Sequence, residues 1–548
     1  MTRGAADVVS GYARGTEELA GGTTSARPNA ARDGSARAAA MQFGFAVAVV
    51  VASLLLYRPW HDAPFASADF PEFVPLLRSQ PTFGGRLGVF VDYYGAHGRF
   101  NLLQYVFIIL KWQVLGANPV AWQWARALQM FGILAGTFAL LRRLRLSASS
   151  AATAVALLGV STATASGWTR LTMGEPLALL FLLGAALLAA RFQLAHEWKR
   201  VSLGFAVLVA AMLLTKEMMI ASLPFLLLLA LLYRGAGEWG RRSYSLTARE
   251  KTLLVATALA VATAAVPIVA CMTTRASGGF ASHYGEGGVA PGRVAYAVAR
   301  MLLPVNASQT SALRVLLFPA NALIALVIGA GLTSAARCRS RSLVWPVATA
   351  LSLPLAGAVV YLPWPVVANF YPLPFQVGAA TLLALSLDMM RSAVPRMLPA
   401  ARVMCAVATI LAAAASHRMA GNAYASRHVE ARLSDWLAGN VRPGQRVLRA
   451  VPSDALPPPE RAWMGIGSTL SRYIGAFYAR PDLRVVEVSC DEASALYRGE
   501  GSVVVLYKGE CPRFGTPAAA PTITFGYFDP LLLRAATDSV RAEIFRSR

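Results

Sequence analysis

Carboxylates gather in one short stretch of a sequence that is otherwise poor in acids. The segment HDAPFASADFPEFV, residues 61–74, follows an uncharged apolar run and carries Asp62, Asp69 and Glu72. The whole chain has 28 acidic residues against 51 basic ones, so this grouping requires an explanation. A carboxylate held beside a weak nucleophile can take its proton as attack begins. We expect Asp69 to be that base, with Asp62 or Glu72 helping to place a cation or the acceptor.

A structural role accounts for part of this cluster. Asp69 can cap a helix, with Pro71 in the first turn and Glu72 closing a capping box three residues later. Capping leaves the other ionisable residues of the same loop unexplained, which are Asp62, Asp92, His97 and Arg99. Both interpretations of Asp69 therefore stay open.

Further polar residues stand in the segments between other apolar runs. A leaving phosphate or pyrophosphate would require lysine, arginine or a divalent cation to neutralise its charge. The residues are Arg170 and Glu175 in TRLTMGEP, Lys216 and Glu217 in TKEM, His283 and Glu286 in SHYGEGG, and Asn369 and Tyr371 in VVANFYPLP. Singly, each could mark the membrane interface. Together they form a pocket if the topology brings them to one face.

Membrane-spanning helices are the elements that must position these residues. The chain of 548 residues is 56% hydrophobic and 14% charged, whereas soluble proteins carry about 25% charged residues. The stretch 201–233 is too long for one span, because it would reach about 50 Å across a core of about 30 Å, so we predict two short spans joined at TKEM. Predominantly apolar runs predict eleven spans in all, at 39–57, 121–141, 148–166, 176–192, two within 201–233, 252–273, 316–335, 343–362, 373–390 and 397–415.

The distribution of basic residues predicts the orientation of these spans. Arginine and lysine collect in the N-terminal tail and in alternate connections, at 142–145, 191–200, 234–251, 337–341 and 391–402. The positive-inside rule places these segments and the N-terminus in the cytoplasm. The connections that carry the candidate residues then face outward, namely 58–120, 166–175, 215–218, 274–315 and 363–372. This assignment requires that 100–116 lies at the interface rather than spans, and Asn101, Gln104 and Lys111 near one helical face favour that interpretation.

The two ends of the chain differ from its middle. Residues 1–37 are small and polar, which predicts a disordered cytoplasmic tail before a transmembrane domain at 38–415. From 416 to 548, β-rich runs alternate with helical stretches such as 427–440, which predicts a small extracytoplasmic α/β domain. Cys490 and Cys511 alone share that domain, so an oxidising compartment would pair them in a disulfide. The alternative is two unrelated buried thiols.

The order of these motifs resembles the GT-C glycosyltransferases. The shared features are acids that open the first outward loop, an amphipathic interfacial helix, Glu-Pro at 175–176, LTKE at 214–217 and Tyr-Pro at 371–372. That superfamily includes protein O-mannosyltransferases, lipid A aminoarabinose transferases and oligosaccharyltransferases, and it uses polyprenyl-phosphate sugar donors. The resemblance covers roughly residues 39–390. It implies a mainly α, polytopic membrane fold.

The resemblance also implies roles for individual residues. The first-loop acid most resembles Asp69, with Asp62 as the rival, and the second-loop acid resembles Glu175. These two would hold a divalent metal such as Mg or Mn. The family's arginine near the late Tyr-Pro is absent here, so phosphate contact passes to other cations or the donor differs. We expect donor or acceptor binding from Arg99, Arg170, Glu175, Lys216, His283, Glu286, Asn369 and Tyr371.

These expectations define an enzyme and its alternatives. The expected activity moves a hexose or pentose from a polyprenyl-phosphate donor to a glycan, lipid or protein acceptor at the outer face of the bacterial inner membrane. No GxxxxGK[ST] motif occurs, so the donor must carry its own activation. Alternatives are a transporter or flippase of lipid-linked sugars, or a polysaccharide ligase or polymerase of another fold. Nucleic-acid binding is disfavoured because the basic residues are dispersed among loops.

Overall fold

The computed structural model describes most of the chain from Val51 to Arg546. The described residues are 44, 48–49, 51–57, 64–65, 73–96, 99–235, 238–240, 245–275, 291–303, 311–337, 343–362, 371–443, 445–453, 470–471, 474–475, 477–478, 480–498, 503–507, 511, 523–524, 527–529, 534–536 and 541–546. The predicted tail at 1–37 lies outside them. So do eight residues named above, which are Asp62, Asp69, Pro71, Glu72, His97, His283, Glu286 and Asn369.

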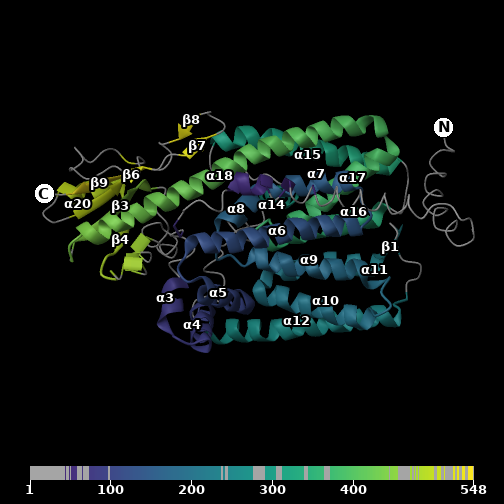
Figure 1. Cartoon of the computed structure of the whole chain (residues 1–548), viewed down its shortest axis with the longest axis horizontal. Helices are drawn as coiled ribbons and strands as arrows, with labels where there is room; N and C mark the ends of the chain where they lie inside the picture. The colour runs from purple at the N-terminus through teal and green to yellow at the C-terminus, as the bar shows by residue number, and fades with distance from the viewer. Residues whose placement is uncertain are drawn as a thin grey trace, which may run out of the picture.

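Long apolar helices lie roughly side by side and form the body of the protein (Figure 1). They are α6 (Pro119–Arg143), α7 (Ala148–Gly159), α8 (Thr162–Thr169), α9 (Glu175–Phe192), α10 (Trp198–Thr215), η1 (Glu217–Ser222), α11 (Leu223–Leu232), α12 (Ala248–Arg275), α14 (Pro291–Leu302), α15 (Ser311–Arg337), α16 (Val344–Tyr361), α17 (Gln376–Ala393), η3 (Pro395–Met397) and α18 (Leu398–Asn440). Among the described residues, six helices are long and apolar enough to cross a membrane, or seven if a bent pair counts as one. The chain is thus a multi-pass membrane protein, and the count of eleven spans stays a prediction.

Two predicted spans contain breaks, one expected and one not. The stretch 201–233 divides where predicted, because α10 ends at Thr215 and η1 begins at Glu217. The span predicted at 148–166 is bent, because α7 and α8 meet at an angle of 55°. Ser161 causes this break. Its hydroxyl accepts a hydrogen bond from the Thr164 amide at 3.2 Å and so starts a new helix.

The basic connections meet at one end of the bundle, opposite the end where α9 begins (Figure 1). The Tyr233 hydroxyl donates to the carbonyl of Arg143 at 2.7 Å, which joins two of these connections. Arg234 donates to Gln193 at 2.9 Å and joins a third. The basic connections that the structure describes therefore lie together at one end, as the predicted alternation of connections requires. Which side of a membrane each end faces stays a prediction.

An aspartate from α17 caps α7 at the basic end. The Asp388 carboxylate accepts from the Ser147 amide at 2.7 Å, from the Ser147 hydroxyl at 2.6 Å and from the Ser150 hydroxyl at 2.7 Å. We expect Asp388→Ala to lower the free energy of unfolding by about 2 kcal/mol, because three donors lose their acceptor. Asp388→Asn keeps one acceptor oxygen and should cost less. Thermal unfolding in detergent measures both, and equal stability of all three proteins would contradict the capping role.

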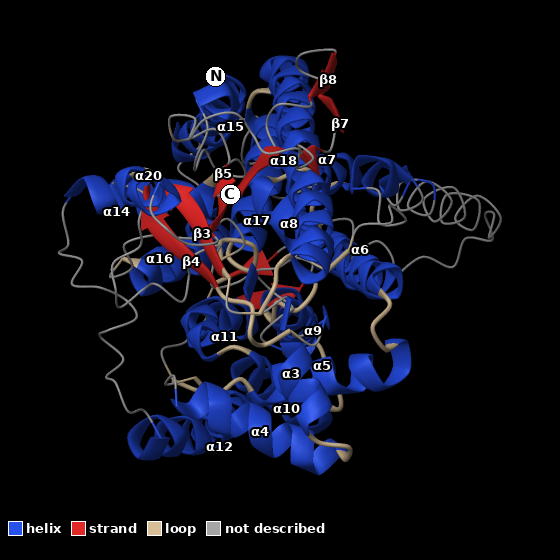
Figure 2. Ribbon diagram, turned by 90° about the vertical axis from the view of Figure 1, so that its left-hand side faces the viewer, coloured by secondary structure: helices blue, strands red, loops and turns tan. Residues whose placement is uncertain are grey.

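Three short helices lie at the other end of the bundle, beside α10 and α12 (Figures 1 and 2). They are α3 (Phe73–Ser79), α4 (Phe83–Ala96) and α5 (Leu102–Leu115). The 14 residues of α5 reach only about 21 Å, too short to span a membrane. Its apolar Val114 is 80% exposed, whereas Lys111 is buried. Lys111 of the predicted polar face therefore turns toward the protein, and so do the apolar Ile108 and Ile109 of the same helix.

The long helix α18 links the bundle to a sheet. Its 43 residues reach about 65 Å, so its C-terminal half projects beyond the bundle (Figure 1). The helix predicted separately at 427–440 is the last part of α18, and no break occurs at the domain boundary predicted at 415–416. Val429, Leu433 and Leu437 form the predicted apolar stripe and pack against residues of the sheet.

The sheet has five strands, in the order β4-β3-β5-β9-β6. The elements are β3 (Arg446–Val451), β4 (Val485–Ser489), α20 (Cys490–Arg498), β5 (Val503–Tyr507), β6 (Ile523–Thr524) and β9 (Arg541–Arg546), and outside this sheet are the small pairs β7 (Tyr527–Asp529) with β8 (Arg534–Ala536) and β1 (Tyr233–Gly235) with β2 (Glu238–Trp239). The central strand β3 runs parallel to β4 and β5, with Val447 opposite Val485 and Val504. Figure 2 shows α20 beside this sheet.

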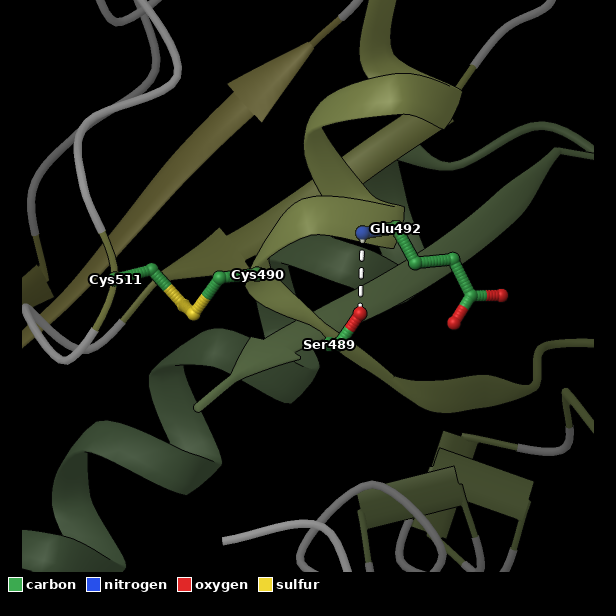
Figure 3. The surroundings of a disulfide bond; sticks show 4 residues. All are labelled: Ser489, Cys490, Glu492 and Cys511. Carbon is green, nitrogen blue, oxygen red and sulfur yellow. Dashed lines mark hydrogen bonds between the residues drawn. A yellow bond between two sulfur atoms is a disulfide. The ribbon is translucent and has the colours of Figure 1, made fainter. Parts of the chain in front are cut away.

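A disulfide joins Cys490 at the start of α20 to Cys511 (Figure 3). Their Cα atoms are 5.6 Å apart, within the range that a disulfide requires. Mass spectrometry of unreduced peptides should find these two cysteines linked. The bond closes a loop with a sequence separation of 21 residues, so Cys490→Ser should cost the C-terminal region about 3 kcal/mol of stability. Two free thiols in unreduced protein would contradict this expectation.

Candidate functional site

An ion pair between Glu175 and Lys216 forms the centre of the candidate site. The Glu175 carboxylate and the Lys216 ammonium are 3.0 Å apart, and their side chains are only 5% and 10% exposed. Glu175 begins α9, where Pro176 fits the first turn. Lys216 follows the last residue of α10. Each charge thus stands at the helix end whose dipole favours it.

Two more groups, the Tyr371 ring and the Glu217 carboxylate, act on the Lys216 ammonium. It lies 5.8 Å from the centre of the Tyr371 ring, which stacks on Tyr361. Lys216 stands in the turn after α10, outside the spanning segments. Burial lowers the pKa of Lys216, but the negative charges of Glu175 and Glu217 outweigh burial and raise this pKa above its ordinary value. Lys216 therefore carries its charge at neutral pH.

The structure brings together four of the residues predicted from the sequence. Glu175, Lys216 and Tyr371 are in contact, and the charge of Arg99 also acts on Lys216. Arg170 is half-buried at the C-terminus of α8 and begins the loop that leads to Glu175. The remaining predicted residues lie outside the described part of the chain, so their positions stay predictions.

Several buried polar atoms at this end have no hydrogen-bond partner among the described residues. They are Asn101 Oδ1, Gln104 Oε1, the Tyr105 hydroxyl and Glu217 Oε2. Buried polar atoms are nearly always paired in native proteins, so such a group marks a place for water or a ligand. Sequence reasoning assigned Asn101 and Gln104 to the interface and missed Tyr105. The signal was present, because all three stand at the start of an apolar segment.

The described residues contain no group of three or more side chains that could hold a metal ion. Glu175 contributes a single carboxylate, which already pairs with Lys216. Its predicted partner in a metal site, Asp69, lies outside the described residues. Within the described part of the site, an ammonium therefore occupies the position between two acids.

No family model and no curated protein matches the chain. Several solved structures are similar to it, all at low sequence identity. ArnT from Cupriavidus metallidurans bound to undecaprenyl phosphate is 13% identical with a TM-score of 0.43, and the match covers 92% of this chain and 97% of that one. Oligosaccharyltransferase AglB from Archaeoglobus fulgidus, in complex with an inhibitory peptide and a dolichol-phosphate, is 12% identical with a TM-score of 0.48, over 91% and 74% of the two chains.

Arabinofuranosyltransferase AftD from Mycobacteria is also similar. It is 14% identical with a TM-score of 0.47, and the match covers 92% of this chain and 40% of AftD. At these TM-scores the likenesses establish no residue-by-residue correspondence. We therefore argue the function from the site itself.

Proposed function

We propose that this protein is a membrane glycosyltransferase that moves a sugar from a polyprenyl-phosphate donor to an acceptor on the outer face of the membrane. The observation that carries the proposal is the charged Lys216, which pairs with Glu175 and is further stabilised by the negative charge of Glu217, at one end of an apolar helix bundle. A lipid-anchored donor presents its phosphate at such an end. When the sugar leaves, negative charge grows on that phosphate, and a preorganised cation in a water-poor site stabilises it.

The cations and acids have separate roles in this proposal. Lys216 and Arg99 neutralise the leaving phosphate, and Glu175 orients Lys216. The carboxylate of Glu175 is already paired with Lys216, so we do not assign it as the base. We assign the base that accepts the proton of the acceptor to Asp69, with Asp62 or Glu72 placing the acceptor or a cation.

The anchoring of the first loop supports this role for Asp69. Phe65 packs edge-on against Trp122 with ring centres 6.2 Å apart, and the Lys111 ammonium lies 4.1 Å from the centre of the same Trp122 ring. Asp69 follows Phe65 by four residues in the sequence, so it belongs to the same loop. The predicted metal, Mg or Mn, would need Asp69 as a ligand beside Glu175, whose carboxylate also pairs with Lys216, and it would add positive charge to the leaving phosphate.

The proposal includes the predicted topology. Eleven spans put the N-terminus in the cytoplasm and the C-terminal α/β region outside, in a bacterial inner membrane. Reporter fusions at Gly240 and Glu430 should therefore label opposite sides, since Gly240 follows the basic end and Glu430 lies on the far half of α18. Labelling on the same side would remove the outward location of the site.

Donor turnover by the purified protein tests the reaction. The protein is incubated with a panel of polyprenyl-phosphate hexoses and pentoses and with membrane glycolipid acceptors, and mass spectrometry follows the lipid. A transferase releases free polyprenyl phosphate and yields a heavier acceptor. A flippase leaves the donor intact, so an unchanged donor together with its movement across vesicles would replace this proposal by the transporter alternative.

A further inference from the structure

Three consecutive backbone carbonyls between α8 and α9 are held by side chains of α5 and α6. The Gln104 amide donates to the Thr172 carbonyl at 2.9 Å, and the Arg126 guanidinium donates to the Met173 carbonyl at 3.1 Å. The Lys111 ammonium lies 3.5 Å from the Leu171 carbonyl. Each backbone carbonyl from Leu171 to Met173 therefore faces a side-chain donor.

Two of these donors are buried basic side chains. Arg126 is 1% exposed and Lys111 is 7% exposed. Burial lowers the pKa of Lys111, and the neighbouring charge of Arg126 lowers it further. The Lys111 nitrogen also lies 4.1 Å from the centre of the Trp122 ring. Simple apolar packing would hold a loop without burying two basic side chains, so the arrangement indicates that the position of the loop itself matters.

Gly174, the next residue along the chain, packs closely at the point where this loop meets the ion pair. A Cβ atom on Gly174 would lie 2.5 Å from Gln104 Oε1 and 3.3 Å from the carbonyl of Thr215. Gly174 directly precedes Glu175, and Thr215 directly precedes Lys216. The loop is therefore packed between Gln104 and the end of α10, at the two residues that set the spacing of the ion pair.

We infer that Gln104, Lys111 and Arg126 are positioning residues, which hold the loop 171–173 so that Glu175 is fixed against Lys216. The inference rests on the proposed function for its catalytic meaning, but the geometry of the clamp does not. We refer to these three side chains and the carbonyls that they hold as the loop clamp.

Hydrogen exchange tests the loop clamp without any assay of activity. We expect Gln104→Leu to speed amide exchange in the segment 170–175 by about fivefold to tenfold, because a hydrogen bond that contributes about 1 kcal/mol is lost. The matched control is Gln113→Leu, which makes the same change at an exposed position of the same helix. Exchange that is unchanged in Gln104→Leu, or equally raised in both variants, would overturn the clamp.

A second variant distinguishes loss of the loop clamp from general misfolding of Gln104→Leu. Gly174→Ala removes no donor, and the φ of −80° at this position suits alanine, so its effect is steric. It should also speed exchange in 170–175, while exchange in the remote strand β3 stays at the wild-type rate in both variants. Faster exchange in β3 as well would identify general destabilisation and overturn the specific role.

A double-mutant cycle tests whether the clamp acts through Glu175. Gln104→Leu should lower kcat for sugar transfer about tenfold with little change in KM, and it should cost almost nothing further in a Glu175→Gln background. Losses that simply multiply would overturn the positioning role. If wild-type protein transfers no sugar while the exchange results hold, the proposed function fails and the clamp stands.

Discussion

Replacement of Lys216 by methionine is expected to destabilise the protein by about 3–5 kcal/mol and to abolish sugar transfer. The loss in stability follows because Glu175 would keep a buried charge without its ammonium, and a broken buried pair costs more than a missing one. The loss in activity follows because the leaving phosphate loses its main cation. Thermal unfolding in detergent and donor turnover measure the two effects.

The matched control is Lys199→Met, because Lys199 is exposed at the basic end of the bundle. It should behave like the wild-type protein in both measurements. The double variant Lys216→Met with Glu175→Gln removes both charges, so it should regain most of the stability while staying inactive. A Lys216→Met protein that unfolds at the wild-type temperature would show that the pair is not buried in the protein.

Replacement of Asp69 by asparagine is the second change with a large expected effect. A general base contributes about 100-fold or more in rate, and asparagine keeps the size of the side chain but cannot take the proton. A helix cap predicts another pattern, because Asp69→Asn and Asp69→Ser would both preserve the cap and cost well under 1 kcal/mol. Turnover and unfolding of both variants therefore separate the two roles.

The pattern of losses decides the assignment of Asp69. Low turnover in both variants with unchanged unfolding identifies the base. Near-normal turnover in Asp69→Asn would leave Asp69 as a cap and move the catalytic role to Asp62. Glu72→Gln serves as the comparison, because a helper that places a cation or the acceptor should cost less than the base.

The convergence of Glu175, Lys216 and Tyr371 could be predicted from the sequence because each follows or precedes an apolar run. Once the basic connections mark one end of a helix bundle, the alternate connections must meet at the other end. The topology determines which residues gather at this end, but not the distances between their side chains. The spacing of Glu175 and Lys216 depends on Gly174 and Gln104, which are distant in sequence and carry no local signal of their contact.

The helix at 100–116 shows where periodicity stops being informative. The pattern predicts that Gln104 and Lys111 share a face, and the structure agrees. Periodicity does not say whether that face meets water or the protein interior. In a membrane protein an apolar face can turn toward lipid, so the polar face of α5 contacts the loop before Glu175 instead of solvent.

The bend at Ser161 and the continuity of α18 escaped prediction for related reasons. Hydropathy windows average over many residues, so one hydroxyl that caps a helix leaves no trace in them. The buried positions Cys405, Ala408, Ala412 and Ala415 keep helical spacing up to the predicted boundary at 415–416. No proline follows Pro399 within α18, so nothing in the chain ends the helix at that boundary.

The most direct test of the site compares sugar transfer by Glu175→Gln with transfer by Glu197→Gln. Glu197 is 68% exposed and pairs only with Arg200 on its own helix turn among the described residues, so it makes a matched control. With a polyprenyl-phosphate sugar as donor, wild type and Glu197→Gln should release polyprenyl phosphate at equal rates. Glu175→Gln should be slower by roughly 100-fold, because Lys216 loses the group that orients it. Equal rates in all three proteins would contradict the assignment of this ion pair as the catalytic site.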